Sequence, residues 1–259
     1  MRAPELVAFD LDGTLAESKQ RMSSDMGDLL SRLLRRMPVA VMSGAGWPQF
    51  EKQFFPALPE GTPLNNLYIF PDNAAQCFVH RAGEWLPQYD QAFSPAEKER
   101  ITKALKDALQ AVGLERAPVR VWGERIEDRG EEIAFSPLGQ EAPLEEKGEW
   151  HKGHDDVRRR LQEELRKRLP EYASAMGGLT TIDITRKGIN KAYGIKRLSE
   201  LAHTPITQIL YVGDALEAGG NDAVVLDVGV PTHAVFGPEE TSELIENLLA
   251  RKPAVSLGA

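Results

Sequence analysis

The chain has little cysteine and no long apolar run. Cys77 is its one cysteine, and no segment approaches the roughly 18 apolar residues of a membrane-spanning helix. A single cysteine excludes an intrachain disulfide framework and a cysteine-rich metal site. The first residues lack the basic flank and cleavage site of a secretory signal. We therefore expect a protein of the reducing cytoplasm that has no membrane partner.

Positive charge is also scarce. The 31 lysines and arginines stand against 39 aspartates and glutamates, which gives a formal net charge of −8. A chain with this net charge has no broad positive electrostatic potential to attract polyanions, so we expect no nucleic-acid partner. A length of 259 residues with 42% hydrophobic residues indicates one large or two modest globular domains.

Both ends of the chain alternate short apolar runs with helical patterns. Strands are predicted at residues 5–9, 39–42, 67–70, 208–212 and 223–226, and helices at 26–37 and about 190–202. This order contains a βαβ unit. It predicts an α/β fold with a mostly parallel sheet covered by helices.

The pattern changes between these ends. Ser94-Pro95-Ala96-Glu97 is a capping box that begins a helix ending at Gly113, and a second helix ends before Pro170. A hairpin is predicted at 77–86, and short strands at 119–122, 133–135 and 180–184. Helices mixed with antiparallel strands indicate a separate α+β domain. We predict a core of residues 1–77 and 186–259, interrupted by an insert of residues 78–185.

Polar residues follow the predicted parallel strands or open the helix beside them. They are Asp10 with Asp12, Ser43, Lys191 and Asp214. The carboxyl ends of strands in an open parallel sheet border the active crevice, so we expect these residues to converge. Two carboxylates suit phosphoryl transfer, because one attacks phosphorus and the other handles the proton of the leaving or entering oxygen.

Such chemistry needs a divalent ion, for which Mg²⁺ is the expected choice, because an anionic aspartate must approach an anionic phosphate. Asp214 would complete its ligands, and the hydroxyls of Thr14 and Ser43 with the Lys191 ammonium would hold phosphate oxygens. Taken singly, the aspartates and the serine could be turn residues, and the lysine a solvated helix residue. These single interpretations do not explain the whole set in this order.

The segments that carry this chemistry resemble the four motifs of the haloacid dehalogenase superfamily. They are Phe9-Asp10-Leu11-Asp12-Gly13-Thr14-Leu15, Ser43-Gly44, Lys191, and Val212-Gly213-Asp214 followed by Gly219-Gly220-Asn221-Asp222. Among members with a type IIB cap, the chain is most similar to eukaryotic-type phosphomannomutases and related sugar phosphatases. The similarity spans nearly the whole chain. It implies a Rossmann-like core with an inserted α+β cap of the C2 type.

The resemblance also implies roles for particular residues. Asp10 would be the nucleophile and Asp12 the general acid/base, with Mg²⁺ held by Asp10, the Asp12 carbonyl and Asp214. Asp222, next to Asn221, would orient Lys191. Contacts to phosphate or sugar would come from Thr14, Gly44, Lys19, Arg129, Lys147, Thr181 and Asp183. The resemblance is compatible with a homodimer formed through the cap.

Three positions depart from the mutase pattern. Lys19 replaces an arginine that follows the first motif, and Gln140 and Lys147 replace two arginines of the cap. Arginine can bind a phosphate with two parallel hydrogen bonds, and lysine cannot. We therefore expect weaker binding of the distal phosphate, which is the phosphate group that does not react with Asp10. A mutase must retain a bisphosphate intermediate, whereas a phosphatase needs only water to attack the aspartyl phosphate.

The leading hypothesis is therefore a Mg²⁺-dependent phosphatase that hydrolyses a hexose phosphate, such as mannose 6-phosphate, through an aspartyl-phosphate intermediate. The alternative is a phosphomannomutase or phosphohexomutase that interconverts hexose 1- and 6-phosphates. A non-catalytic sugar-phosphate sensor should have lost Asp12 or Lys191, and both are present. A phospho-accepting signalling domain should be about half this length and lack the insert.

Overall fold

The computed structural model describes residues 3–18, 20–116, 118–217 and 220–250. The chain divides into two compact units. The core unit consists of Met1–Asp90 with Ile189–Ala259, and the inserted unit of Gln91–Gly188. Among the described residues, the core unit has two buried apolar clusters and the inserted unit has one, so each unit is described by itself.

The core unit is built on a seven-stranded sheet. Its strands are β1 (Leu6–Asp10), β2 (Val39–Met42), β3 (Leu67–Phe70), β4 (Gln76–Arg81), β5 (Glu84–Asp90), β10 (Ile209–Gly213) and β11 (Thr232–Ala234). They lie in the order β11-β10-β1-β2-β3-β4-β5. The first five are parallel, and β4 and β5 join antiparallel beyond β3. The α/β core with its parallel sheet is thereby confirmed.

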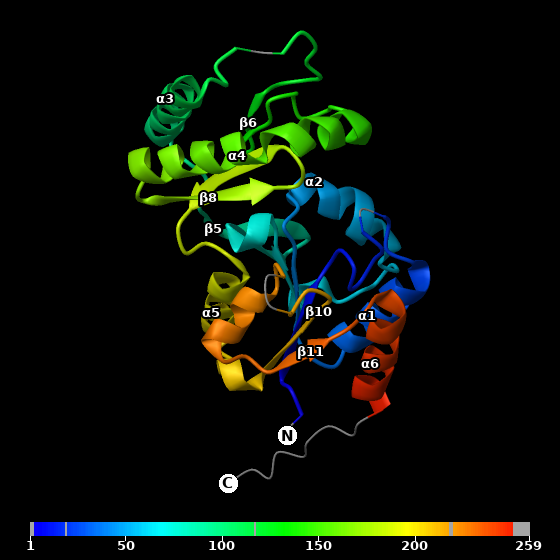
Figure 1. Ribbon diagram of the computed structural model, residues 1–259. Helices are drawn as coiled ribbons and strands as arrows, with labels where there is room; N and C mark the ends of the chain where they lie inside the picture. The colour runs from blue at the N-terminus through cyan, green and yellow to red at the C-terminus, as the bar shows by residue number, and fades with distance from the viewer. Residues whose placement is uncertain (1–2, 19, 117, 218–219, 251–259) are drawn as a thin grey trace. The chain divides into compact units, whose positions relative to one another are not determined.

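Helices cover both faces of this sheet (Figure 1). Val7 and Phe9 of β1 pack with α1 (Ser24–Leu34) and α6 (Pro238–Ala250), whereas Leu6 and Ala8 pack with α5 (Lys191–Leu201). Side chains alternate across a strand, so a run that is buried throughout must be covered on both sides. Burial of a large side chain such as that of Phe9 contributes about 1.5–3 kcal/mol.

Short helical segments complete the core unit. They are α2 (Trp47–Gln49), the π-helical turn η1 (Phe50–Phe54), and the 3₁₀ turns η2 (Phe55–Ala57), η3 (Leu64–Asn66), η4 (Asp72–Ala74), η5 (Ile206–Gln208) and η6 (Ala223–Val228). Of these, α2 and η1 follow β2 directly. They therefore lie at the edge of the sheet where the parallel strands end.

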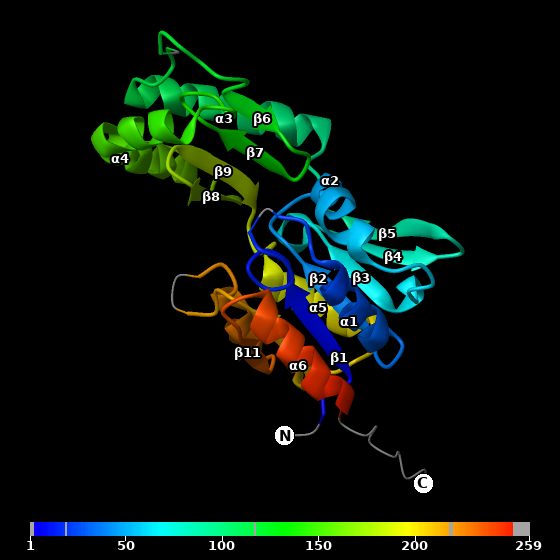
Figure 2. The ribbon, with the colours of Figure 1, turned by 90° about the vertical axis from the view of Figure 1, so that its right-hand side faces the viewer.

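The inserted unit is an α+β arrangement (Figure 2). Its strands are β6 (Ile126–Asp128), β7 (Glu132–Phe135), β8 (Tyr172–Gly177) and β9 (Thr181–Arg186), and its helices are α3 (Pro95–Val112) and α4 (Leu144–Arg168). The antiparallel sheet has the order β6-β7-β9-β8. Apolar residues of both helices, including Leu105 and Leu161, pack against Ile133 and Ile184 of the sheet. The capping box of Ser94 and Glu97 and the left-handed Gly113 bound α3 as predicted.

Three predictions about elements are wrong. The border predicted at residues 77/78 fails because β4 and β5 extend the core sheet, so the insert begins at Gln91. Residues 223–226 form the 3₁₀ turn η6 in place of a strand, and the edge position that a strand there would take is filled by β11. Residues 119–122 form no strand. A short apolar run does not by itself distinguish a strand from another buried segment.

No helix among the described residues combines the length and the apolar character needed to cross a membrane.

The packing of α1 against η2 leads to a prediction about Gly27. A Cβ atom on Gly27 would overlap the main-chain carbonyl oxygen of Ala57. A main-chain atom cannot easily move away from such a contact. Gly27→Ala should therefore destabilise the protein by about 1–3 kcal/mol, despite the better helix propensity of alanine. Gly148 in α4 is the matched control, because a Cβ there meets nothing within 4 Å. Gly148→Ala should stabilise by about 0.5–1 kcal/mol. Thermal unfolding followed by circular dichroism measures both, and equal effects would contradict the packing argument.

Candidate active site

A buried lysine joins two aspartates at the carboxyl edge of the core sheet. Asp10 ends β1, Lys191 begins α5, and Asp222 precedes η6. Lys191 Nζ donates hydrogen bonds to Asp10 Oδ1 and, at 2.6 Å, to Asp222 Oδ1. The exposed fractions are 3% for Asp10, 1% for Lys191 and 0% for Asp222. Three ionisable groups that are buried and hydrogen-bonded to one another form a preorganised polar site rather than a solvated surface patch.

Burial and charge shift the pKa values of this group. Burial raises the pKa of Asp10 to about 7, an effect larger than the opposing influence of Lys191. Burial lowers the pKa of Lys191, but the charges of Asp10 and Asp222 outweigh it and leave that pKa above its usual value. The two aspartates therefore favour the charged form of Lys191, whereas burial favours the protonated form of Asp10.

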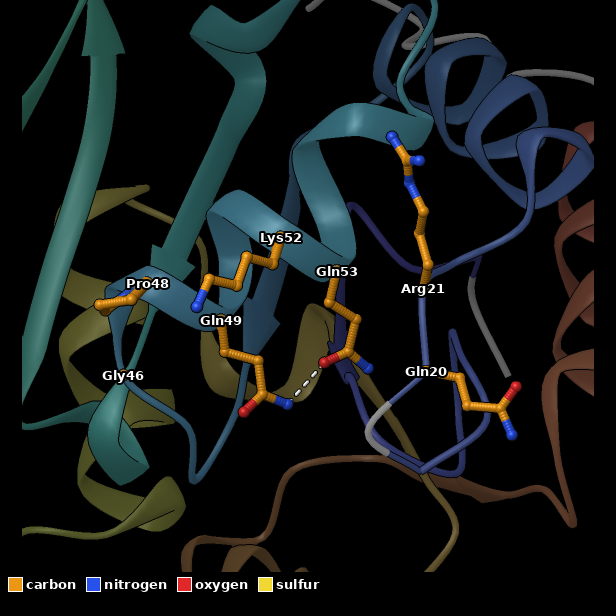
Figure 3. A pocket seen from close by; sticks show the side chains of 7 residues that line it. All are labelled: Gln20, Arg21, Gly46, Pro48, Gln49, Lys52 and Gln53. Carbon is orange, nitrogen blue, oxygen red and sulfur yellow. Dashed lines mark hydrogen bonds between the residues drawn. The ribbon is translucent and has the colours of Figure 1, made fainter.

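Two glutamines hold the side chain of Asp12. Gln49 Nε2 donates to Asp12 Oδ2 at 3.1 Å, and Gln53 Nε2 donates to Asp12 Oδ1 at 3.0 Å. Gln49 Nε2 also donates to Gln53 Oε1 at 2.5 Å, the bond drawn in Figure 3. Both glutamines come from the α2–η1 segment after β2. Two amide donors on two different carboxylate oxygens fix the orientation of Asp12 relative to the buried group.

Asp214 adds a further carboxylate beside Asp10. Oxygen atoms of Asp10, Asp214 and Asp222 lie within 4.8 Å of one another. Asp222 is already occupied, since it accepts from Lys191, from Tyr211 Oη at 2.6 Å and from the Ala215 N–H at 3.3 Å. The assignment of Asp10 and Asp214 as ligands of a cation stays a prediction, which this cluster of carboxylates permits.

The adjacent loop offers more support for a bound ion and phosphate. Gly13 has φ +79°, and a Cβ atom there would overlap the carboxylate of Asp214. The hydroxyl oxygen of Thr14 is buried and has no hydrogen-bond partner among the described residues. A buried hydroxyl without a partner, in the residue that follows Gly13, fits a site for a phosphate oxygen. The part of the predicted metal site that involves the Asp12 carbonyl stays a prediction.

The structure places the other predicted core residues as follows. Ser43 follows β2, is buried, and accepts from the Ala45 N–H at 3.0 Å. Gly44 is exposed beside it, and a Cβ there would lie 3.4 Å from Asn73 Oδ1. Asn221 is exposed and forms no hydrogen bond within the described residues. Lys19 lies outside the described residues.

The predicted cap residues come from several elements of the inserted unit: Arg129 follows β6 of its sheet, and Lys147 lies on α4. Arg129 donates to Glu127 at 2.7 Å and to Glu132 at 2.6 Å. The Lys147 ammonium donates to the main-chain oxygen of Gln140 at 2.9 Å. The guanidinium of Arg129 is thus already paired with acidic neighbours. It would have to exchange these partners to bind a phosphate.

Asp183 and Thr181 lie on β9 of the same sheet. Burial raises the pKa of Asp183 to about 6, and its Oδ1 is buried without a hydrogen-bond partner among the described residues. The Thr181 hydroxyl donates to the Gly177 carbonyl. The structure therefore brings the predicted cap residues together within the inserted unit, and their roles stay predictions.

Sequence reasoning missed several residues of these sites. Gln49 and Gln53 contact Asp12, and Tyr211 contacts Asp222. The signal for the glutamines was their spacing of four residues just after the second strand. Arg158 was missed too: it is 3% exposed and donates to main-chain oxygens of Gly177, Gly178 and Thr181. No sequence pattern indicates that an arginine of a helix will be buried against the turn between two strands.

The raised pKa of Asp10 predicts how metal binding depends on pH. Below about pH 7 its carboxyl is protonated and is a poor ligand, so the affinity for Mg²⁺ or Mn²⁺ should fall by about tenfold for each further pH unit. Above that pH the affinity should level off. Calorimetric titrations between pH 5.5 and 8.5 measure it, with Asp12→Asn as a control that keeps the dependence. An affinity that stays constant across this range would contradict the assignment of Asp10.

Comparisons with known proteins identify the family of the chain. The family model described as eukaryotic phosphomannomutase matches residues 26–251. A probable phosphomannomutase of Caenorhabditis elegans is 27% identical over 252 residues, which cover 94% of this chain and 95% of that protein. The phosphomannomutase of Saccharomyces cerevisiae is 25% identical over 249 residues, covering 94% and 93%.

Solved structures extend the likeness of fold. An IMP-bound IMP-nucleotidase of Plasmodium falciparum superposes with a TM-score of 0.63 at 17% identity, covering 96% of this chain and 69% of that chain. Trehalose-6-phosphate phosphatase of Aspergillus fumigatus gives a TM-score of 0.60 at 16% identity, covering 95% and 92%. At these identities the two structures show the fold alone. The match of the family model over most of the chain establishes that this protein belongs to the eukaryotic phosphomannomutase family, within the haloacid dehalogenase superfamily.

Proposed function

We propose that the chain transfers a phosphoryl group of a hexose phosphate through Asp10 and interconverts hexose 1- and 6-phosphates. The observation that carries the transfer chemistry is the buried contact of Asp10 with Lys191 and Asp222, next to the fixed carboxylate of Asp12. The sequence alone placed hydrolysis first. Phosphomannomutases that match nearly the whole chain support interconversion.

Each residue of the core site has a part in this chemistry. An oxygen of Asp10 attacks phosphorus, and the bond from phosphorus to the sugar oxygen breaks. Asp12 protonates the departing oxygen and later takes a proton from the incoming hydroxyl. The Lys191 ammonium holds Asp10 and neutralises charge on the phosphoryl oxygens, while Asp222 keeps the lysine in place.

A divalent cation, with Mg²⁺ as the expected species, would be held by Asp10 and Asp214. It would supply positive charge between the nucleophile and the phosphate. The unpaired Thr14 hydroxyl would bind a phosphate oxygen. Cytoplasmic localisation and a homodimer through the inserted unit stay predictions.

Hydrolysis is the second candidate, favoured by the inserted unit. By the resemblance, Gln140 and Lys147 replace arginines of the mutase pattern, and Arg129 is paired with Glu127 and Glu132. If the distal phosphate is bound weakly, the sugar phosphate dissociates before it can turn around in the site, and water then attacks the aspartyl phosphate. Hydrolysis and interconversion share every step up to the phosphorylated Asp10.

Replacing the nucleophile tests the shared chemistry. Asp10→Asn is nearly isosteric and should fold, but turnover of mannose and glucose phosphates should fall by about 10⁴-fold or more, because the nucleophile acts as a unit with its partners. Ser18→Ala, on an exposed loop residue, is the control and should retain the activity. Phosphate release and isomer formation are followed by coupled assays. Turnover that survives in Asp10→Asn would remove the aspartyl-phosphate mechanism.

Product analysis separates the two candidates. With a trace of hexose 1,6-bisphosphate, the protein should interconvert mannose 1- and 6-phosphate faster than it releases inorganic phosphate. ³¹P NMR follows both products in one sample. Replacing Gln140 and Lys147 with arginine should shift the balance further toward interconversion, because two bidentate donors are added. Phosphate release that dominates in the natural protein would establish hydrolysis as its function instead.

A further inference from the structure

The turn η4 has a backbone conformation that its residues disfavour. Asp72, Asn73 and Ala74 have φ angles of 53°, 53° and 67°, all in the left-handed region. Residues with a Cβ atom are disfavoured there, and alanine more than asparagine or aspartate. The other non-glycine residues with positive φ in the described chain, Ala82 and His203, occur singly and are exposed. Three such residues in succession persist only where surrounding contacts impose them, and this kind of strain concentrates at functional sites.

Packing against α5 imposes this conformation from one side. Ala74 is fully buried in the core unit. A Cβ atom on Gly194 of α5 would lie 2.6 Å from the Ala74 Cβ and 3.1 Å from Met42 Sδ. The helix that begins with Lys191 therefore packs directly against η4 and the end of β2.

Hydrogen bonds to the loop after β2 hold η4 from the other side. The Asn73 N–H donates to the Ser43 carbonyl oxygen at 2.8 Å, and the Asp72 N–H donates to the Ala45 carbonyl oxygen at 3.1 Å. The Ser43 hydroxyl also accepts from the Ala45 N–H at 3.0 Å. Two carbonyl groups of this loop are therefore turned toward η4.

This arrangement orients the N–H group of Gly44. In a trans peptide the C=O and N–H groups point in opposite directions, and the described residues contain no cis peptide. The Gly44 N–H shares its peptide with the Ser43 carbonyl, so it points away from η4. It has no hydrogen-bond partner among the described residues. Because β2 lies between β3, which precedes η4, and β1, which ends at Asp10, this N–H points to the side of Asp10 (Figure 2).

We propose that Asn73 is a positioning residue that acts through its main chain. Its left-handed conformation holds the Ser43 carbonyl, and thereby aims the Gly44 N–H at an oxygen of the phosphoryl group bound at Asp10. Asparagine suits this position because it adopts a left-handed φ more readily than most residues with a side chain. The inference rests on the proposed function, because the phosphoryl group must lie at Asp10. It adds a residue that lies outside the four motif segments of the sequence.

Two replacements of Asn73 separate the main chain from the side chain. Asn73→Gly removes the side-chain amide but permits the left-handed φ, whereas Asn73→Val disfavours it, because valine is β-branched. The probe is tungstate, a tetrahedral oxyanion like phosphate, titrated by calorimetry with saturating Mg²⁺. Asn73→Gly should leave the dissociation constant nearly unchanged. Asn73→Val should raise it by about tenfold or more, as expected for the loss of one hydrogen bond to a charged group.

The same replacements at His203 are the matched controls. His203 has φ 51°, is exposed, and follows α5 at the end opposite Lys191. Both valine variants should therefore lower the melting temperature, but only Asn73→Val should weaken tungstate binding. If Asn73→Val does not fold, Asn73→Ala takes its place, because alanine disfavours a left-handed φ less than valine does.

Three results would overturn the inference and leave the proposed function standing. The first is an unchanged tungstate affinity in Asn73→Val, and the second is an equal loss in His203→Val. The third is an equal loss in Asn73→Gly and Asn73→Val, which would assign the contact to the side chain of Asn73. A direct readout is the amide signal of Gly44 in ¹⁵N NMR spectra, which tungstate should shift in the natural protein and in Asn73→Gly but not in Asn73→Val.

Turnover tests the proposed function separately. If the natural protein binds tungstate but turns over no hexose phosphate, the proposed function fails, and the tungstate affinities of the variants still decide the role of Asn73. A natural protein that binds no tungstate overturns the inference. If the protein is active, Asn73→Val should raise KM for mannose 1-phosphate, and Asn73→Gly should keep the natural value.

Discussion

The contact of Lys191 with Asp10 and Asp222 is the constraint on which the rest of the core site depends. All three side chains are almost fully buried. Removing one partner from a buried ion pair costs about 3–5 kcal/mol, because the remaining charge has no water to solvate it. The end of β1, the start of α5 and the segment after β10 must therefore close together. Asp222 is itself secured by the Tyr211 hydroxyl from within β10.

This closure places a second demand on the loop after β1. Its backbone must pass so close to Asp214 that only glycine fits at position 13, where φ is also positive. The same turn buries Thr14 with an unused hydroxyl. Unpaired buried hydroxyls are costly, and sites that bind ligands are where such a cost is retained. The core site thus combines the ion-paired group of Lys191 with its two aspartates, in which several contacts support each side chain, with the Thr14 hydroxyl, which lacks a partner among the described residues.

Much of this site could be predicted from sequence, since it follows from one topological rule. Asp10, Ser43 and Asp214 each come directly after a short apolar run, and parallel strands bring such positions to one edge. The spacing of Gln49 and Gln53 was visible in the sequence, but their contact with Asp12 was not, because it depends on the π-helical turn at Phe50–Phe54. The hairpin near residues 76–90 was visible in the sequence, but the sheet it joins is decided by tertiary pairing with β3. Local patterns determine elements, and long-range contacts determine their partners.

The distribution of paired and unpaired cations bears on the choice between hydrolysis and interconversion. In the inserted unit, Arg129 is engaged by two glutamates and Lys147 by a carbonyl, so a phosphate there must compete with existing partners. In the core unit, Arg21 and Lys52 have no such partners among the described residues. A cation that is already paired gains little from a new anion, whereas an unpaired one gains the whole interaction, reduced only by solvent screening. A phosphate in the inserted unit is therefore bound only as tightly as Arg129 can exchange Glu127 and Glu132 for it, and the balance between hydrolysis and interconversion depends on that exchange.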